Sequence, residues 1–370
     1  MAPELRALVL TPDFPPAVGG IQTVLHRVLE HAKGLRPRVV TLRHENGAFF
    51  DAGLDFPVHR VPRTPLGYRA TIGLLNADAV QQALRHRPQV ILSGHIVVAP
   101  AATLIRRVLG VPVAQYLHGY ELAARPSLTS FAVRHAEANI AVSHYTKEVA
   151  IRAGASRRRV HVIPNGVDAD GTRPPVERNS APTVLTVAQL SYRYKGHDVM
   201  LRALPLVAAR VPEVRWVVVG EGPLRPELET LAQSYGVRDR VRFVGRVSDS
   251  ERDAWYHRAH VFAMPARTPA AGVGEGFGIA FLEANAHGLP VVAGAVGGAL
   301  EAVVDGETGV LVEPTDHIAV ADAITDLLED PEGARRLGAV GAERARREFA
   351  WPSIAARVEA LLRSSAEQPR

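Results

Sequence analysis

Two glutamates, Glu275 and Glu283, lie eight positions apart in the segment Glu-Gly-Phe-Gly-Ile-Ala-Phe-Leu-Glu. The first stands among glycines, which let a backbone approach a ligand closely, and the second falls on a short segment with helical spacing. The start of a helix offers free N–H groups to an anion, and carboxylates on either side of that anion can hold sugar hydroxyls. The segment therefore predicts a site for a sugar carried on a phosphate.

A pair of carboxylates also suggests a glycoside hydrolase, but the spacing argues against one. Eight residues of helix span about 12 Å, whereas hydrolytic pairs lie about 5–5.5 Å or about 6.5–9.5 Å apart. A loop at Glu275 shortens this distance only in part. Two carboxylates that hold the two ends of one long ligand explain the spacing better.

A basic segment, Tyr-Arg-Tyr-Lys-Gly-His-Asp at residues 192–198, follows another predicted strand. Parallel sheets bind ligands outside the carboxyl ends of their strands, so cations there are candidates for phosphate binding. Lys195, next to a glycine and a predicted helix, is one candidate, and Arg193 is the other. The alternative is an ordinary solvated loop.

Further candidates follow predicted strands in the first half. Gly19 and Gly20 precede a helix after the first strand and would let its N-terminus face a phosphate. His118 ends another strand, where an imidazole donates to a substrate hydroxyl or carries a proton. Turn glycines and a capping or core histidine are the ordinary alternatives. Four other histidines are expected on helix surfaces: His31, His197, His257 and His287.

Two motifs are assigned no chemistry. The turn Gly220-Glu221-Gly222 begins like a dinucleotide fingerprint, but the third glycine is missing and a proline interrupts it, so a tight turn that lines a cleft is expected. Asp168-Ala169-Asp170 matches the D-x-D pattern that binds metal in some transferases, but it falls in a predicted linker. No essential metal is therefore expected.

Composition limits the class of protein. The chain has 370 residues, of which 47% are hydrophobic, and this is enough for two cores. It has no cysteine, and no apolar run approaches the roughly 20 residues of a spanning helix. The pI of 9.7 is compatible with anionic membranes or phosphorylated substrates, but the basic clusters are short and scattered, so no nucleic-acid partner is expected. We expect a cytoplasmic protein, with peripheral contact at the inner membrane face left open.

Strands alternating with helices predict an α/β fold of two Rossmann-like, doubly wound parallel-sheet domains facing across a cleft. The first domain is expected at residues 1–166, the second at 167–348, and a closing helical segment at 349–370. Six strands are expected in each half: 5–10, 38–42, 90–92, 113–116, 138–142 and 160–163, then 183–187, 215–219, 241–244, 261–263, 291–293 and 309–312.

The motifs together resemble those of the retaining GT-B glycosyltransferases of family 4. Their E-x7-E motif is matched by Glu275 and Glu283, their glycine loop by Gly19 and Gly20, and their interdomain Pro-Asn-Gly-Val-Asp by residues 164–168. Residues 14–22 and 262–267 look like actinobacterial phosphatidylinositol mannosyltransferases, which use GDP-mannose. The resemblance covers essentially the whole chain.

The resemblance implies a role for each matched position. Glu275 would hold donor-sugar hydroxyls, Glu283 the ribose, and Lys195 the diphosphate. His118 would contact the transferred sugar, and Val244 would border the base. The backbone amides implied in donor binding are those of Gly276, Phe277, Gly278 and Ile279. The last helix would cross back onto the N-terminal domain, and no cofactor or metal is implied.

One position departs from the family. An arginine that binds the diphosphate is expected in a Gly-Arg-Leu-like segment, where this chain has Gln189. Arg193, four residues further on, is the candidate replacement.

The sequence therefore predicts a retaining hexosyltransferase that uses a nucleoside diphosphate sugar, with mannose and GDP favoured and UDP open. The acceptor is left open between a lipid-linked and a soluble glycoside. Residues 66–86 are expected to pack in the core, the alternative being a membrane-facing helix. The other functions considered are a sugar-nucleotide 2-epimerase of the same fold, a non-catalytic sugar-nucleotide-binding module and, with no complete fingerprint, a nicotinamide oxidoreductase.

Overall fold

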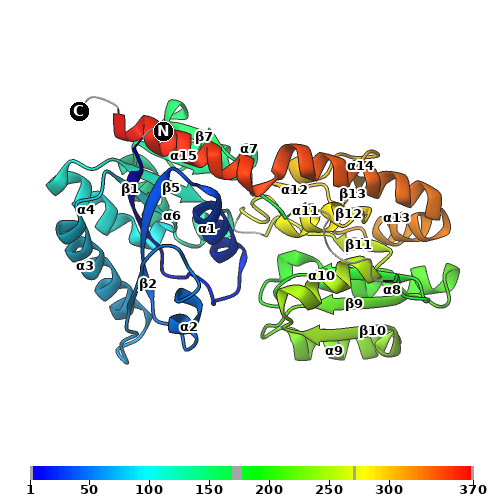
Figure 1. Ribbon diagram of the computed structural model, residues 1–370. Helices are drawn as coiled ribbons and strands as arrows, with labels where there is room; N and C mark the ends of the chain where they lie inside the picture. The colour runs from blue at the N-terminus through cyan, green and yellow to red at the C-terminus, as the bar shows by residue number, and fades with distance from the viewer. Residues whose placement is uncertain (1–2, 169–176, 270–271, 368–370) are drawn as a thin grey trace. The chain divides into compact units, whose positions relative to one another are not determined.

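The protein is known from a computed structural model that describes residues 3–168, 177–269 and 272–367. Contacts along the chain divide it into two compact units (Figure 1). The first runs to Gly166 and takes up the chain again from Trp351, and the second runs from Val167 to Ala350. Each unit has its own sheet and its own hydrophobic core.

The sheet of the first unit has seven parallel strands in the order β3-β2-β1-β4-β5-β6-β7. They are β1 (Leu5–Leu10), β2 (Leu35–Leu42), β3 (Val58–Val61), β4 (Val90–Ser93), β5 (Val113–Leu117), β6 (Ala138–Ala141) and β7 (Val160–Val162). Most are short apolar runs, because a parallel sheet covered by helices is buried on both faces.

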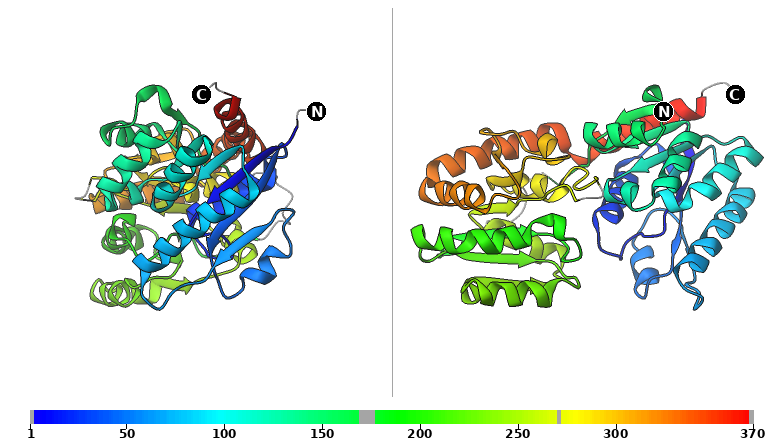
Figure 2. Two further views of the ribbon diagram at one scale, coloured as in Figure 1. Left: turned by 90° about the vertical axis from the view of Figure 1, so that its left-hand side faces the viewer. Right: turned by 180° about the vertical axis from the view of Figure 1, so that it is seen from behind.

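Helices cover both faces of this sheet (Figures 1 and 2). Helix α3 packs against α4 on one face, and α1 packs against α15 on the other. The helices are α1 (Gly20–His31), α2 (Gly47–Asp51), α3 (Tyr68–His86), α4 (Ala99–Leu109), α5 (Tyr120–Ala124), α6 (Pro126–His135), α7 (His144–Arg152) and α15 (Trp351–Glu367), with 3₁₀ turns η1 (Ile96–Val98) and η2 (Arg157–Arg159). The last helix of the chain thus completes the first unit.

The second unit has six parallel strands in the order β10-β9-β8-β11-β12-β13. They are β8 (Thr183–Val187), β9 (Arg215–Val219), β10 (Val241–Gly245), β11 (Val261–Met264), β12 (Val291–Gly294) and β13 (Gly309–Val312). The helices are α8 (His197–Arg210), α9 (Arg225–Ser234), α10 (Asp249–Arg258), α11 (Ile279–Ala286), α12 (Ala299–Ala302), α13 (His317–Glu329) and α14 (Pro331–Phe349), with 3₁₀ turns η3 (Arg193–Lys195) and η4 (Arg238–Arg240). Helix α8 packs against α13, and α11 packs against α14.

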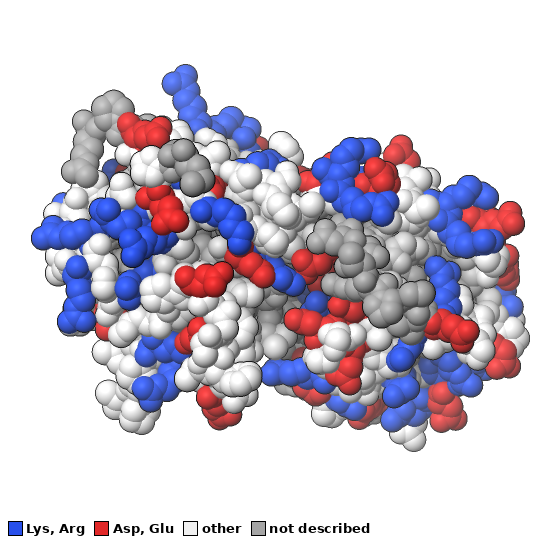
Figure 3. All heavy atoms as spheres, viewed as in Figure 1, with Lys and Arg blue, Asp and Glu red and all other residues white. Residues whose placement is uncertain are grey.

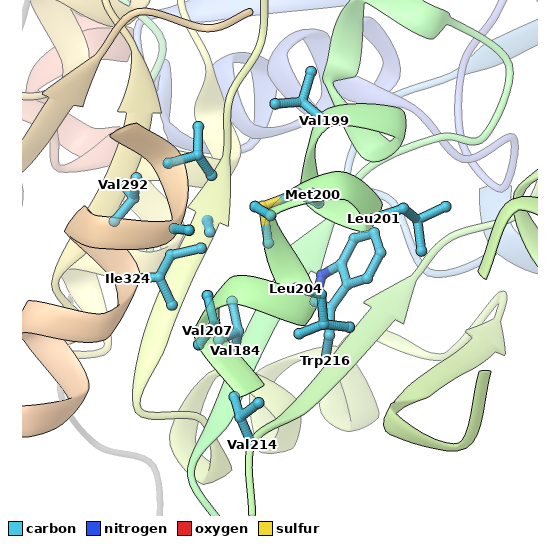
Figure 4. Close-up of a cluster of buried hydrophobic side chains, with 14 of the residues drawn as sticks. Val184, Val199, Met200, Leu201, Leu204, Val207, Val214, Trp216, Val292 and Ile324 are labelled. Atoms are coloured by element: carbon cyan, nitrogen blue, oxygen red, sulfur yellow. The ribbon is translucent and has the colours of Figure 1, made fainter. Parts of the chain in front are cut away.

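The core of the second unit gathers around Trp216 of β9, which is fully buried (Figure 4). Met200 and Leu204 of α8 and Ile324 of α13 belong to the same cluster. The indole N–H of Trp216 donates to the hydroxyl of Thr186 at 2.9 Å, so the polar atom of this large side chain is paired inside the core.

The α/β fold of two Rossmann-like parallel-sheet domains is confirmed, with one correction to the strand count. The predicted six strands of the first half are seven, because β3 lies at the edge of the sheet. Three of its four residues are only partly buried, and two of them are His59 and Arg60. A short, half-exposed, basic edge strand lacks the apolar run by which the others were recognised.

In both sheets the strand order reverses beside the first strand, between β1 and β4 and between β8 and β11. In such sheets the connections diverge at this switch point, and ligands bind at the carboxyl ends of the strands there. The loop after β8 carries Lys195, and the loop after β11 carries Glu275. Topology therefore brings the two strongest candidate side chains of the second unit to one sheet edge.

Basic and acidic side chains are interspersed on the face shown in Figure 3. Among the described residues, no helix combines the length and apolar character needed to cross a bilayer.

Candidate active site

Lys195 is held in place by the one-turn helix η3 between β8 and α8. Gly196 follows with a φ of 81°, in the left-handed region that favours glycine, and a Cβ there would overlap the carbonyl oxygen of Pro265. The Lys195 nitrogen lies 5.2 Å from the ring centroid of Tyr194. Only 16% of the Lys195 side chain is exposed, so its charge is only partly screened by water.

Replacing Gly196 with alanine is expected to lower the free energy of unfolding by roughly 2–4 kcal/mol. About 1–2 kcal/mol comes from the left-handed backbone, and the rest comes from the overlap with Pro265. Gly236→Ala is the matched control, since Gly236 has a φ of 69° and open space around its Cβ position. Urea unfolding of both variants measures the difference, and equal losses would show that the Pro265 contact contributes nothing.

Glu275 lies in the loop after β11, and its side chain is 13% exposed. Its carboxylate oxygen Oε2 forms an ion pair with the ammonium of Lys195. Its backbone carbonyl accepts a hydrogen bond of 3.0 Å from the N–H of Gly298, and a Cβ on Gly298 would overlap the carbonyl oxygen of Gly276. The loop after β12 therefore packs against the Glu275 segment and fixes its backbone.

The segment from Gly276 to Ile279 forms the entrance to α11. Gly278 is the residue before the helix and has a φ of 92°, which again favours glycine. Phe277 is 2% exposed and packs against Phe349, with ring centroids 5.7 Å apart. Within the described residues no side chain caps α11 and no acidic residue lies in its first turn, so its N-terminal end suits an anion.

Glu283 lies one turn into α11 and is held by α10. The hydroxyl of Tyr256 donates to its Oε2 at 2.8 Å, and the Arg252 guanidinium lies 3.7 Å from its Oε1. Its side chain remains 19% exposed. The structure thus explains Glu283 as an anchored carboxylate, not as a free surface charge.

His118 follows β5 in the first unit. Its Nε2 lies 3.1 Å from the carbonyl oxygen of Gly94, which requires the proton on Nε2 and leaves Nδ1 as the acceptor nitrogen. Its ring is parallel to that of Tyr116, with centroids 4.8 Å apart, and the backbone N–H of His118 donates to the carboxylate of Glu121 at 2.6 Å. Burial lowers the pKa of His118 to about 4, so the imidazole is neutral at neutral pH.

Two histidines expected on helix surfaces are buried instead, and those predictions were wrong. His197 is 2% exposed and stands over Trp216 at the start of α8, with ring centroids 6.5 Å apart. The side chain of His287 is 5% exposed and stacks on Tyr256. A histidine on a helical pattern carries no signal of burial, because its ring serves as either a polar or an aromatic group.

Acid is expected to destabilise the protein below pH 6.5. Burial lowers the pKa of His95, His118 and His197 from 6.5 to about 4. Between these values the unfolded chain binds protons that the folded chain does not, so the free energy of unfolding falls as pH falls through this window and is unaffected above it. Unfolding measured from pH 8 to 4 tests this. His197→Phe should lower by up to one the number of protons taken up on unfolding, so the free energy of unfolding depends less steeply on pH. An unchanged slope would contradict the assignment of this proton uptake to His197.

The glycine pair of the first unit opens α1. Gly19 is the residue before the helix, with an extended backbone, and Gly20 is its first residue. The carbonyl of Gly19 accepts bonds of 3.1 Å from the N–H and the hydroxyl of Thr23. No side chain in the described part of the chain caps this helix, which follows the carboxyl end of β1.

The structure also places Arg193, Val244 and the turn at Gly220 and Gly222. Arg193 forms two hydrogen bonds of 2.6 Å with Glu227 and is 62% exposed. Val244 is half-buried near the carboxyl end of β10. The carbonyl of Gly222 accepts a turn hydrogen bond from the N–H of Arg225 at 3.2 Å, and a Cβ on Gly220 or Gly222 would overlap the backbone at Ala188 or Leu190.

No cluster of three potential metal ligands is found among the described residues. The D-x-D pattern is only partly visible, because Asp168 is described and Asp170 lies outside the described residues.

Sequence reasoning missed two residues of the second unit. Tyr256 and Arg252 lie four positions apart on α10 and both face Glu283. Nothing in their spacing indicates a ligand site. The only available signal is that a tyrosine on an apolar helix face needs a partner for its hydroxyl.

The second unit thus offers a shielded lysine, a carboxylate paired with it, an uncapped helix start and an anchored carboxylate further along that helix. A cation and helix amides stabilise an anionic leaving group, and carboxylates accept from hydroxyls. This set suits a sugar on a nucleoside diphosphate.

Two family models match the chain and together cover most of it. Residues 18–170 match the model "Glycosyltransferase Family 4", and residues 172–344 match "Glycosyl transferases group 1".

Curated relatives match along the whole chain. It is 34% identical over 380 residues to the GDP-mannose-dependent alpha-(1-6)-phosphatidylinositol monomannoside mannosyltransferase of Mycobacterium tuberculosis, covering 97% of this chain and 98% of the relative. It is 29% identical to the GDP-mannose-dependent monoacylated alpha-(1-6)-phosphatidylinositol monomannoside mannosyltransferase of Corynebacterium glutamicum, covering 98% and 99%.

A solved structure shares the fold. Anabaena Alr3699/HepE in complex with UDP and glucose superposes with a TM-score of 0.82 at 22% identity, covering 98% of this chain and all of that one. Both family models, the full-length relatives and the fold agree. The chain belongs to glycosyltransferase family 4, and it is a hexosyltransferase of the GT-B fold that uses a nucleotide sugar.

Proposed function

We propose that this protein transfers a mannosyl group, with retention, from GDP-mannose to a hydroxyl of a phosphatidylinositol-linked glycoside. The observation that carries the proposal is the Lys195–Glu275 pair at the switch point of the second sheet, beside the uncapped start of α11. The choice of GDP, mannose and lipid rests on the printed activities of the full-length relatives.

The second unit binds the donor in this proposal. Glu275 accepts from hydroxyls of the transferred sugar, and the amides from Gly276 to Ile279 bind the sugar and the phosphate. Glu283 accepts from the ribose hydroxyls, and Val244 borders the base. In the first unit, the start of α1 at Gly19 and Gly20 is the candidate site for a donor phosphate, and Nδ1 of His118 is the candidate contact for a sugar hydroxyl.

Charge on the departing diphosphate is met by Lys195 and by the amides of α11. Arg193 is the candidate to replace the arginine that the family has where this chain has Gln189. To bind the diphosphate it must leave Glu227, which is possible because this ion pair is exposed and contributes little free energy. With these cations in place we propose transfer that needs no metal, so EDTA should leave the rate unchanged.

Retention follows a front-face path in this proposal. The bond from the anomeric carbon to the diphosphate breaks, the acceptor oxygen bonds to the same face, and its proton passes to the leaving phosphate oxygen. Glu275 is assigned to the sugar hydroxyls and not to attack on the anomeric carbon, since a carboxylate accepts hydrogen bonds readily.

A lipid acceptor is supported by exposed apolar side chains around the start of α3. Leu66 is 83% exposed, Tyr68 48% and Leu74 42%, while Arg63 and Arg69 are exposed beside them. Leu75 of the same helix is fully buried, so the segment packs in the core on one face, as expected, and presents apolar groups on another. Apolar and basic groups together suit an anionic membrane surface.

The test is a product assay with the purified protein. GDP-mannose, UDP-glucose and ADP-glucose are offered with anionic vesicles that contain a phosphatidylinositol mannoside, or with a soluble mannoside. The proposal expects α-linked mannosyl lipid from GDP-mannose in the vesicle arm. Product only from another donor would overturn the choice of GDP-mannose. Product only with the soluble mannoside would overturn the lipid-linked acceptor.

A further inference from the structure

Tyr256 of α10 is fully buried, and its hydroxyl lies against the carboxylate of Glu283. We propose that Tyr256 is a positioning residue that fixes one oxygen of Glu283 and thereby aims the other at the hydroxyls of the nucleotide ribose. The inference rests on the proposed function, in which Glu283 binds the ribose.

The hydrogen bond has one direction. The Tyr256 hydroxyl donates to Oε2 of Glu283 at 2.8 Å. Burial raises the pKa of Tyr256 well above its usual value, with the charge of Glu283 acting in the same sense, so the phenol keeps its proton. The tyrosine is therefore a permanent donor, and Oε2 is permanently occupied.

The second oxygen is placed differently. Oε1 of Glu283 lies 3.7 Å from the guanidinium of Arg252, beyond a normal hydrogen bond, while Arg252 bonds at 2.7 Å to Asp249. A carboxylate accepts about four hydrogen bonds in all. Oε1 thus keeps capacity for the two donors of a vicinal diol.

The Tyr256 hydroxyl cannot move along with the Glu283 carboxylate. The ring of Tyr256 stacks on His287 of α11, with centroids 5.0 Å apart and planes at 22°, and lies 6.0 Å from the ring of Phe262 on β11. Held between a helix and a strand, the hydroxyl has one position, so it selects one rotamer of Glu283.

A simpler explanation is that Glu283 only satisfies a buried hydroxyl. That explanation predicts a loss of stability when the hydroxyl is removed and no change in what the site binds. Discrimination between ribose and deoxyribose separates the two, because only a positioning role connects Tyr256 to the ligand's hydroxyls.

The experiment is titration calorimetry with GDP and 2′-deoxy-GDP, with UDP and 2′-deoxy-UDP in parallel. The proteins are the wild type, Tyr256→Phe, Glu283→Gln, the double variant Tyr256→Phe/Glu283→Gln, and Tyr235→Phe. Tyr235 is 40% exposed at the end of α9 and is the matched control. Phenylalanine removes one oxygen and keeps the ring packing, and thermal unfolding verifies that each variant is folded.

The wild type and Tyr235→Phe are expected to prefer the ribonucleotide by about tenfold or more, the size of one hydrogen bond to a charged group. Tyr256→Phe should lose about tenfold of that preference, and it should lose nothing further in the Glu283→Gln background. A variant that is less stable but discriminates like the wild type would overturn the inference alone. A wild type without ribose preference in either series would overturn the role of Glu283 in the proposed function as well.

Discussion

Lys195→Ala is expected to lower kcat for sugar transfer by about 100- to 1,000-fold, the usual effect of removing one preorganised electrostatic stabiliser. Only 16% of the Lys195 side chain is exposed, so water cannot replace its charge efficiently. Initial rates at saturating donor measure the effect. Lys33→Ala, at an exposed lysine, is the control and should retain full activity.

The same substitution has a second expected consequence. It leaves the Glu275 carboxylate largely buried without its partner, which should cost roughly 2 kcal/mol of folding free energy. The double variant Lys195→Met/Glu275→Gln removes both charges and should recover that stability but not the activity. Recovery of activity along with stability would show that Lys195 matters for folding and not for the leaving group.

Glu275→Gln is expected to abolish most transfer, again by about 100- to 1,000-fold, while binding of the bare nucleoside diphosphate stays equal or tightens. The ion pair occupies Lys195 in the ligand-free protein, and a neutral amide releases that cation for phosphate oxygens. The lost activity comes from weaker contacts to the sugar hydroxyls.

Calorimetry with GDP and rate measurements with GDP-mannose test both halves of this prediction. Glu307→Gln, at an exposed glutamate beside β13, is the control. Transfer within threefold of the wild type would remove Glu275 from the reaction. A large loss of GDP affinity would mean that Glu275 holds Lys195 in position for the phosphates, and does not compete with them for its charge.

Much of the fold was accessible from the sequence. The bounds of β1, β8, β9 and β13 are those predicted, because each is an apolar run between polar or turn residues. The short helical segment expected at Glu283 is α11, and Gly278 before it has a φ of 92°, which favours glycine. The half-exposed strand β3 was missed, since periodicity detects burial and this strand has little.

The contacts of the site were less accessible. Lys195 and Glu275 are 80 positions apart in the chain, and Tyr256 and Glu283 are 27 apart. Each side chain is recognisable as a candidate or as core, but which carboxylate each donor meets depends on how loops from separate strands pack. The pairing of Arg193 with Glu227 is of the same kind.

Helix α15 has a consequence for how the protein is made. It supplies Ile354, Ala355 and Val358 to the core of the first unit, yet it follows the whole of the second unit in the chain. The second unit is one uninterrupted stretch of chain, from Val167 to Ala350, and is finished before α15 exists. During synthesis the first unit is therefore completed after the second, and the apolar side of α1 that α15 covers stays open to chaperones until α15 has been made.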